Sequence, residues 1–81
     1  MPRFFFHLEN TASPTKDVEG VELESVDAAK CHAVTIIAEA LCHEPMGFWR
    51  ADTYQITVTD ERELTLFMVC MMSVIAPSLG E

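Results

Sequence analysis

The feature that most constrains this chain is a predicted strand at residues 64–72, which carries apolar side chains on both of its faces. Successive side chains of a strand point to opposite faces of a sheet. The first set of side chains is Leu64, Leu66, Met68, Cys70 and Met72, and the second set is Thr65, Phe67, Val69 and Met71. A strand with one solvated face shows polar residues on that face. Because one helix can cover only one face of a sheet, we expect the second face to pack against another copy of the chain.

Length and composition are those of a small folded domain. The chain has 81 residues, of which 49% are hydrophobic and 22% are charged, so the composition is not that of a disordered chain. A domain of this size buries only about 60–65% of its unfolded surface, and oligomerisation is a common remedy for such a small core. We therefore expect one domain at residues 1–76, a tail at residues 77–81, and assembly into a homodimer or higher oligomer.

The charge balance argues against two classes of partner. The formal net charge is −8, whereas binding to nucleic acid or to an anionic membrane surface needs clustered basic residues. The basic residues are few and scattered: Arg3, Lys16, Lys30, Arg50 and Arg62. The uncharged run at residues 64–80 is interrupted by Ser73 and Pro77, and its apolar part is too short to cross a bilayer as a helix. We expect no nucleic-acid partner and no membrane contact.

The cysteine content indicates a reducing compartment. Cys31, Cys42 and Cys70 are an odd number of cysteines without the spacing of a disulfide framework. Free thiols are typical of the cytoplasm. No signal peptide is recognisable, because the aromatic run at residues 4–6 is far too short for an apolar signal core. We therefore expect a cytoplasmic protein.

Four segments have the pattern of strands. They are residues 3–9, 18–24, 53–60 and 64–72. The segment at 18–24 is short and charged, which is typical of a sheet edge. The polar turn at residues 60–63 has no glycine, which favours type I geometry.

One helix is predicted between the two pairs of strands. Ser25 is a suitable N-cap, and the helix runs from there to about His43, before Pro45. Apolar residues at helical spacing form the stripe that would lie on the sheet: Val26, Ala29, Ala33, Ile36, Ile37 and Ala40. The following residues 46–52 are predicted to be a connector. The sequence thus predicts an α+β domain of ββαββ type, with one helix packed on a four-stranded antiparallel sheet.

Alternation along each strand predicts which side chains meet this helix. The expected helix-facing set is Phe4, Phe6, Leu8, Val21, Leu23, Tyr54, Ile56, Val58, Leu64, Leu66 and Met68. The expected outer-face set is Phe5, Phe67, Val69 and Met71. We expect this outer face to contact a second copy or to be covered by the tail. A second, weaker apolar stripe on the helix includes Cys31 and Ala38, which are further candidate interface residues.

Three motifs occur in order along residues 1–68. They are Met1-Pro2-Arg3-Phe4-Phe5-Phe6-His7, then Asp17-Val18-Glu19-Gly20-Val21-Glu22-Leu23 leading into Asp27-Ala28-Ala29, and then Ile56-Thr57-Val58-Thr59-Asp60-Glu61. Together they resemble a bacterial family of short proteins that open with Pro-Arg-aromatic-Phe-Phe and are catalogued as a domain of unknown function. The resemblance implies the fold outline and a bacterial cytoplasmic setting, and it implies no activity. The chain departs from the family pattern in its two Cys-His pairs and in its more apolar last strand.

The Cys-His pairs on the predicted helix are weak candidates for a metal site. Zinc needs its ligands around one point, at about 2.0–2.3 Å, whereas Cys31 and Cys42 would lie about 16 Å apart along a helix axis. Neighbouring residues such as Cys31 and His32 also diverge by about 100° around a helix. Only an antiparallel pair of helices in a dimer could bring Cys31 near Cys42 of a second copy. We expect no metal and no other cofactor.

Other candidates for chemistry are also weak. Pro2 could serve as an amine base only without Met1. The acidic residues at 17–24 lack the ordered ligand series of a calcium loop. His7 and Glu9 share a strand face and could form an acid–base pair, but no nucleophile accompanies them. No phosphate-binding or nucleophile-elbow motif is present, and the sequence favours a protein without catalytic activity.

The hypothesis that fits these observations is a non-catalytic, homo-oligomeric protein-interaction module. Two alternatives remain open. The first is a small enzyme with a pocket at a dimer interface, which would use Pro2, His7 or a cysteine. The second is an antitoxin-like regulatory partner that binds another protein. A concave pocket with convergent polar groups would favour the enzyme, and an apolar surface left over after dimerisation would favour the interaction module.

Overall fold

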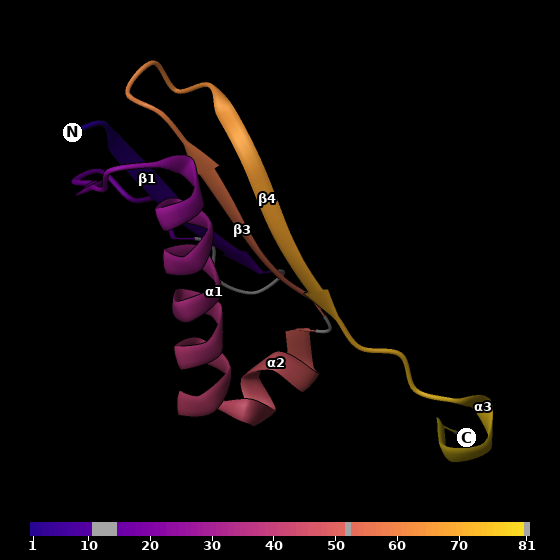
Figure 1. Cartoon of the computed structure of the whole chain (residues 1–81). Helices are drawn as coiled ribbons and strands as arrows, with labels where there is room; N and C mark the ends of the chain where they lie inside the picture. The colour runs from indigo at the N-terminus through magenta and orange to yellow at the C-terminus, as the bar shows by residue number, and fades with distance from the viewer. Residues whose placement is uncertain (11–14, 52, 81) are drawn as a thin grey trace.

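The computed structural model describes residues 1–10, 15–51 and 53–80, and its four strands form one antiparallel sheet (Figure 1). The strands are β1 (Arg3–Asn10), β2 (Val21–Glu22), β3 (Thr53–Thr59) and β4 (Thr65–Met72), and the helices are α1 (Val26–His43), α2 (Pro45–Ala51) and the short α3 (Pro77–Gly80). The strand order is β2-β1-β3-β4, so β1 and β3 are central. The predicted α+β class, with one main helix on a four-stranded antiparallel sheet, is confirmed.

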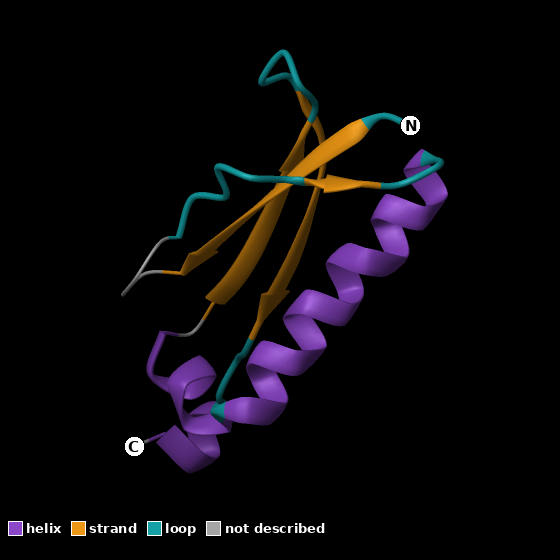
Figure 2. Ribbon diagram, turned by 90° about the vertical axis from the view of Figure 1, so that its left-hand side faces the viewer, coloured by secondary structure: helices purple, strands orange, loops and turns teal. Residues whose placement is uncertain are grey.

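Helix α1 lies along one face of the sheet and forms the core with the two central strands (Figure 2). The Ser25 hydroxyl accepts a hydrogen bond from the backbone N–H of Ala28 at 3.1 Å, which caps the first turn as predicted. The buried core side chains are Ala29, Ala33 and Ile37 from the helix and Phe4, Phe6, Ile56 and Val58 from the strands. Val26 is exposed, so the prediction that it faces the sheet is wrong. The helix buries its sheet-facing side from Ala29 onward.

Residues predicted to be a connector form the second helix, α2. Phe48 on this helix packs edge-on against Tyr54 of β3, with 5.8 Å between the ring centroids, and both side chains are buried. This small second core closes the end of the sheet where α1 ends. The prediction of a connector without helix is therefore wrong. Seven residues are too few to show a helical period in the sequence.

The two faces of β4 are the reverse of the prediction. Phe67 is paired with Val58 and Val69 with Ile56, and residues opposite one another in a sheet share a face. Because Val58 and Ile56 are buried under α1, Phe67 and Val69 point to the helix side and pack against the core. Met71 follows them on that side. The predictions that Leu64, Leu66 and Met68 meet the helix, and that Phe67, Val69 and Met71 form the outer face, are therefore wrong. The two-residue alternation carried no information on the face, because both faces of β4 are apolar.

The first edge strand, β2, is much shorter than the predicted strand at 18–24. It is limited to two residues, which pair with Arg3 and Phe4 of β1. Gly20 precedes it with φ +76°, a left-handed conformation that glycine adopts without strain. A Cβ atom at Gly20 would lie 2.8 Å from Cγ of Arg3 and 3.0 Å from the carbonyl oxygen of Phe4. The chain therefore needs glycine here to bring β2 against β1.

We expect Gly20→Ala to lower the free energy of unfolding by about 1–3 kcal/mol, from left-handed strain and from the close contact with the β1 backbone. Urea unfolding followed by circular dichroism measures this change. Gly47→Ala is the matched control, because Gly47 lies in α2 and its Cβ would meet only the flexible Glu44 side chain, at 3.2 Å. The control variant should be as stable as wild type or slightly more stable. Equal effects at the two positions would contradict this account of the β1–β2 corner.

Candidate functional site

The richest group of polar contacts lies at the corner between β1 and β2, and it centres on Asp17. One carboxylate oxygen of Asp17 accepts the backbone N–H of Phe6 at 3.1 Å, and the other accepts the N–H groups of Glu19 and Gly20, each at 3.1 Å. Burial acts to raise the pKa of Asp17, but the backbone hydrogen bonds from Gly20, Phe6 and Glu19 outweigh it, with a smaller contribution from His7. The pKa of Asp17 therefore lies below its ordinary value of 3.8.

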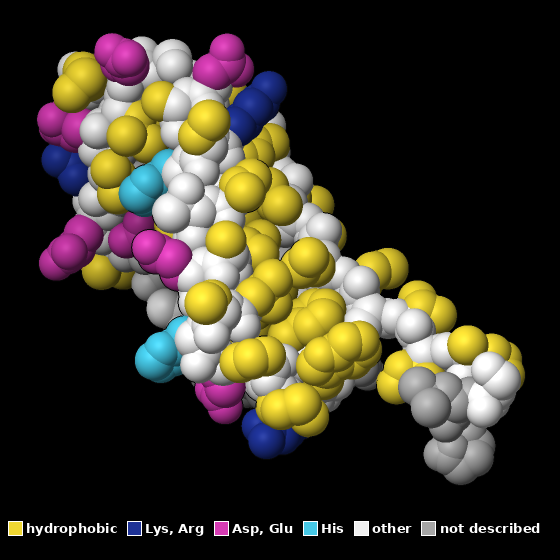
Figure 3. Space-filling model, turned by 60° about the horizontal axis from the view of Figure 1, so that its bottom comes forward, with side chains coloured by type: hydrophobic (Ala, Val, Ile, Leu, Met, Phe, Trp, Pro, Cys, Tyr) yellow, Lys and Arg dark blue, Asp and Glu magenta, His cyan; other side chains and the backbone are white. Residues whose placement is uncertain are grey.

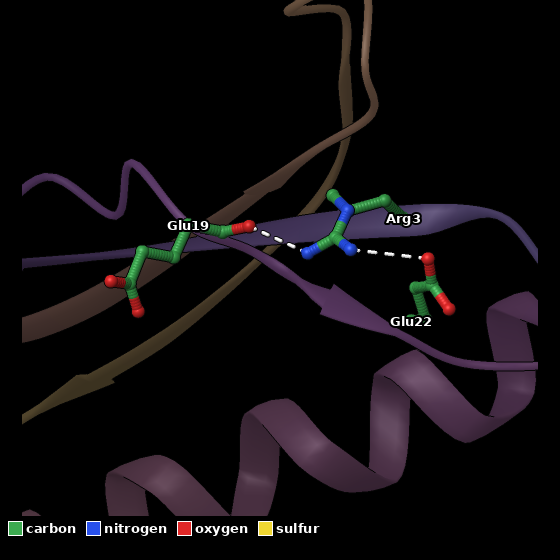
Figure 4. Close-up of polar contacts among 3 residues, drawn as sticks. All are labelled: Arg3, Glu19 and Glu22. Carbon is green, nitrogen blue, oxygen red and sulfur yellow. Dashed lines mark hydrogen bonds and ion pairs between the residues drawn. The ribbon is translucent and has the colours of Figure 1, made fainter.

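Arg3 also stabilises the β1–β2 corner, through contacts with Glu19 and Glu22 (Figure 4). Its guanidinium donates to the carbonyl oxygen of Glu19 at 2.7 Å and to a carboxylate oxygen of Glu22 at 3.1 Å. Both partners are partly exposed, so the ion pair with Glu22 adds little stability. The contact with the Glu19 carbonyl positions the turn before β2. Arg3 and Asp17 therefore act on the backbone of the corner rather than on a ligand.

His7 is held in one orientation by two hydrogen bonds. Its Nδ1 accepts the backbone N–H of Asp17 at 3.1 Å, and its Nε2 lies 3.0 Å from the hydroxyl of Thr59. Because Nδ1 is the acceptor, the proton of the neutral ring is on Nε2 and is donated to Thr59. A general base for a hydroxyl nucleophile needs the opposite arrangement, with a free nitrogen facing the hydroxyl. His7 is thus a structural link between the corner and β3.

Among the described residues, no hydrogen bond joins His7 to Glu9, which were predicted to be a possible acid–base pair. Glu9 accepts instead from the Gln55 amide at 3.0 Å and from the Thr57 hydroxyl at 3.3 Å. These contacts make the outer face of the central strands polar. Strand alternation predicted the shared face of His7 and Glu9, but the partners of each depend on the neighbouring strand.

A shallow hollow of about 260 Å³ lies beside the corner on the outer face. Its lining combines one aromatic ring, two basic groups and several carboxylates: Phe5, His7, Lys16, Asp17, Val18, Thr59, Asp60, Glu61 and Glu63. This volume lies below the usual range for small-molecule sites, about 300–1,000 Å³, whereas the neighbouring hollow lined by His7, Glu9, Thr15 and Lys16, of about 440 Å³, lies within it. The lining contains no cysteine, its histidine is committed to structural bonds, and Pro2 is not part of it. The hollow therefore presents no assembled nucleophile.

The cysteines and the paired histidines do not come together. Cys31, Cys42 and Cys70 are exposed free thiols. His32 packs its ring on Phe6, with 4.7 Å between centroids, and so belongs to the margin of the core. Within residues 1–10, 15–51 and 53–80, no group of three or more potential ligands is placed to hold a metal ion.

The second region of interest is the free edge formed by β4. Among the described strands only β3 pairs with it. On the outer side its exposed apolar residues are Leu66, Met68 and Met72, and on the helix side Met71 is exposed as well. Figure 3 shows hydrophobic side chains gathered from the middle of the molecule along the arm that follows β4, with acidic side chains on the other flank. An eight-residue strand without a charge therefore lies open along its length.

The chain continues past β4 as an apolar arm, which we define as residues 73–80. Val74 is 86% exposed, and Ile75 is exposed as well. The arm extends away from the sheet and ends in α3 (Figure 1). It accounts for the longest dimension of the molecule, 50 Å against 21 Å in the other two directions. The expectation that the tail covers the outer face is therefore wrong within this chain.

The six predicted interface residues do not form one surface. Phe67, Val69 and Met71 lie on the helix side of β4, whereas Phe5 lies on the opposite face, beside the hollow. Cys31 and Ala38 are on the exposed side of α1. Their role in an interface stays a prediction. The sequence signal that locates the open edge is the absence of charge from residue 64 to residue 80.

Comparison with known proteins identifies the family and nothing more specific. A family model described as "Domain of unknown function (DUF6894)" matches residues 3–72. The chain belongs to this family. No curated protein and no solved structure matches the chain. The matched region contains the corner at Asp17 and the whole of β4. No helix among the described residues is long and apolar enough to cross a membrane.

Asp17→Asn should lower the free energy of unfolding by about 1–3 kcal/mol at pH 7, because the amide nitrogen must face one of the backbone donors. Since the pKa of Asp17 is lowered in the folded state, this advantage of the wild type is complete above about pH 3.8 and is lost as the pH falls below it. Urea unfolding of both proteins from pH 7 to pH 2.5 measures the difference.

Asp60→Asn is the matched control for this prediction. Asp60 accepts the N–H groups of Arg62 and Leu64 with a single oxygen, Oδ1, which an asparagine can reproduce. This variant should therefore lose less stability than Asp17→Asn. A loss at Asp17 that does not depend on pH would contradict the assignment of an ionised, backbone-bound carboxylate.

Proposed function

We propose that this protein is a non-catalytic, homo-oligomeric protein-interaction module whose contact surface is β4. The observation that carries the proposal is the position of an uncharged, eight-residue strand at a sheet edge. Sheet edges are normally protected from pairing by charges, by proline or by a very short strand. The edge at β2 has this protection, because it has two residues and carries Glu22. Strand β4 has none of these three protections, and its one irregularity lies at its start, where Val58 pairs with Phe67 and Thr59 with Thr65. The regular, uncharged stretch from Phe67 to Met72 supports a role in pairing with another chain.

The energy available at β4 supports this assignment. Removing a few hundred Å² of apolar surface from water contributes on the order of several kcal/mol. A small domain has a total stability of about 5–15 kcal/mol, so the contact would be a large part of the stability of the protein. The arm after β4 adds Val74 and Ile75 to the surface that a partner could bury.

The charge distribution favours a second copy over a different protein. The chain has 13 acidic residues, none of which lies between residues 64 and 80. Two copies can therefore meet along β4 without opposing like charges, although each has a net charge of −8. A basic partner protein would be attracted to the acidic flank rather than to β4.

The alternatives have weaker support. A small enzyme would need a reactive group in the hollow at the β1–β2 corner, where His7 is committed to structural bonds. An antitoxin-like partner would use the same strand to bind a different protein, and no described residue of β4 offers charge for recognition. The three exposed thiols support the cytoplasm as the compartment.

Wild-type protein should have the mass of a dimer or higher oligomer by light scattering coupled to size exclusion, across a dilution series. We expect Met68→Lys to weaken association about tenfold or more, equivalent to ~1.4 kcal/mol, because it places a charge on the open edge. Met68 suits this test because it is 55% exposed on the outer side. Val69 does not, since it packs against the core and a charge there would unfold the chain.

Met46→Lys is the matched control, because Met46 is 56% exposed and lies on α2. It should leave the mass and the dissociation constant unchanged. Circular dichroism of both variants checks that each is folded. A wild-type protein that remains a monomer at every concentration, or a Met46→Lys variant that dissociates as readily as Met68→Lys, would overturn the proposal.

A further inference from the structure

We infer that two copies join β4 edge to edge about a two-fold axis at Cys70, so that each arm gains a strand partner in the other copy. This inference rests on the proposed self-association and specifies its geometry. The two sheets would form one continuous antiparallel sheet, with both copies of α1 on the same side. Each copy would contribute one continuous segment of chain to this contact, β4 followed by the first part of the arm.

Stacking of the outer faces is a poorer way to bury β4. The central strands present Glu9, Gln55 and Thr57 on that face, joined by hydrogen bonds at 3.0–3.3 Å. Face-to-face stacking would remove this polar group from water together with the apolar side chains of β4. Edge pairing leaves it solvated and satisfies the unpaired backbone groups of the edge.

The arm supplies the second argument for edge pairing. The last pair between β3 and β4 joins Thr53 to Met72, so β3 provides no partner for the residues beyond. Val74 is nevertheless among the most exposed apolar residues of the described chain. A second β4, running antiparallel to the first, would extend past Met72 and lie beside residues 73–75. The arm then gains a strand partner that its own sheet cannot provide.

The limits of the uncharged segment select the register. A two-fold axis normal to the sheet keeps each side chain on its original face, and residues opposite one another in a sheet share a face. One residue of β4 must therefore lie opposite the same residue of the second copy, and the axis passes between these two. Strand β4 begins at Thr65, just after the turn in which Glu63 adopts φ +66°. An axis at Val69 would oppose Ile75 to this turn, and an axis at Met71 would oppose Thr65 to Pro77, which has no N–H group to donate.

An axis at Cys70 avoids both conflicts. It places every residue from 65 to 75 beside the same uncharged segment of the second copy, with regular pairing over residues 67–73, because β4 is irregular between Thr65 and Phe67. Met68 then lies opposite Met72 of the second copy, and Val69 lies opposite Met71. Cys70 lies opposite the same residue of the second copy, on the solvated outer face. Directly opposed Cα atoms in an antiparallel pair are about 4.5–5.5 Å apart, which is within the reach of a disulfide, about 4.4–6.8 Å.

Cysteine cross-linking tests this register. Cys31→Ser and Cys42→Ser leave Cys70 as the single thiol, and diamide is a two-electron oxidant that takes up the two electrons and two protons released as the S–S bond forms. We expect rapid conversion to a covalent dimer on a non-reducing gel, reversed by dithiothreitol. The same protein should be a dimer by light scattering before oxidation.

Moving the thiol along the strand provides the controls. With Cys70→Ser in the same background, Met68→Cys and Met72→Cys each introduce one new thiol. In either variant the thiols of the two copies would lie about 13 Å apart along the strand direction. Neither variant should cross-link alone at a comparable rate, whereas an equilibrated mixture of the two should form the mixed dimer. This reciprocal result follows only from an antiparallel register centred on Cys70.

The outcomes separate the two proposals. A dimer that cross-links through Met68→Cys or Met72→Cys alone, and not through Cys70, overturns the register but leaves self-association at β4 intact. A dimer that cross-links at none of the three positions overturns edge pairing through β4. A monomeric protein overturns both proposals, and any slow cross-linking that it shows reflects random collision of exposed thiols.

Discussion

The packing of α1 across the two central strands is the interaction on which the rest of the structure depends. Ala29 and Ala33 are fully buried and small, so the helix backbone lies close to β3, while Phe4 and Phe6 of β1 fill the rest of the contact. Ile56 and Val58 are the largest side chains that this contact removes completely from water. Because one helix of this length covers the middle of the sheet, the outer strands receive less cover. The two edges differ in sequence: β2 has two residues and carries Glu22, while β4 has eight residues and no charge.

The three sequence motifs at residues 1–7, 17–29 and 56–61 have structural explanations in this chain. Phe4 and Phe6 are core residues, while Arg3, Asp17 and Gly20 hold the backbone of the β1–β2 corner. His7 joins this corner to β3 through Thr59. The family match carries no statement of function, so these residues are explained by their contacts in the fold alone. The segment that stands out beyond the corner is β4 with the arm that follows it.

Much of the fold could be predicted from local patterns, and the two main errors arose where local patterns carry no signal. The cap at Ser25, the end of the helix near His43 and the central strand residues Ile56 and Val58 were predicted correctly, because each has a clear period or a specific terminal signal. Helix α2 was missed because seven residues are too few to show a helical period, and the packing of Phe48 against Tyr54 that stabilises it is a tertiary contact. The faces of β4 were reversed because apolar residues occupy both of them, and the outer face of this strand was consequently assigned to the wrong side chains.

The sequence by itself determined that the chain forms one long helix and a set of antiparallel strands, and that one uncharged segment has more apolar surface than this helix can cover. These properties depend on residue spacing and composition within short segments, so they can be predicted without knowing how distant segments pair. Only the tertiary structure decided that β4 is an edge strand and that Phe67 and Val69 face the helix. Strand order and facing depend on backbone pairing between segments far apart in the chain. When both alternating sets of a strand are apolar, burial of the paired β3 residues under α1 selects between them.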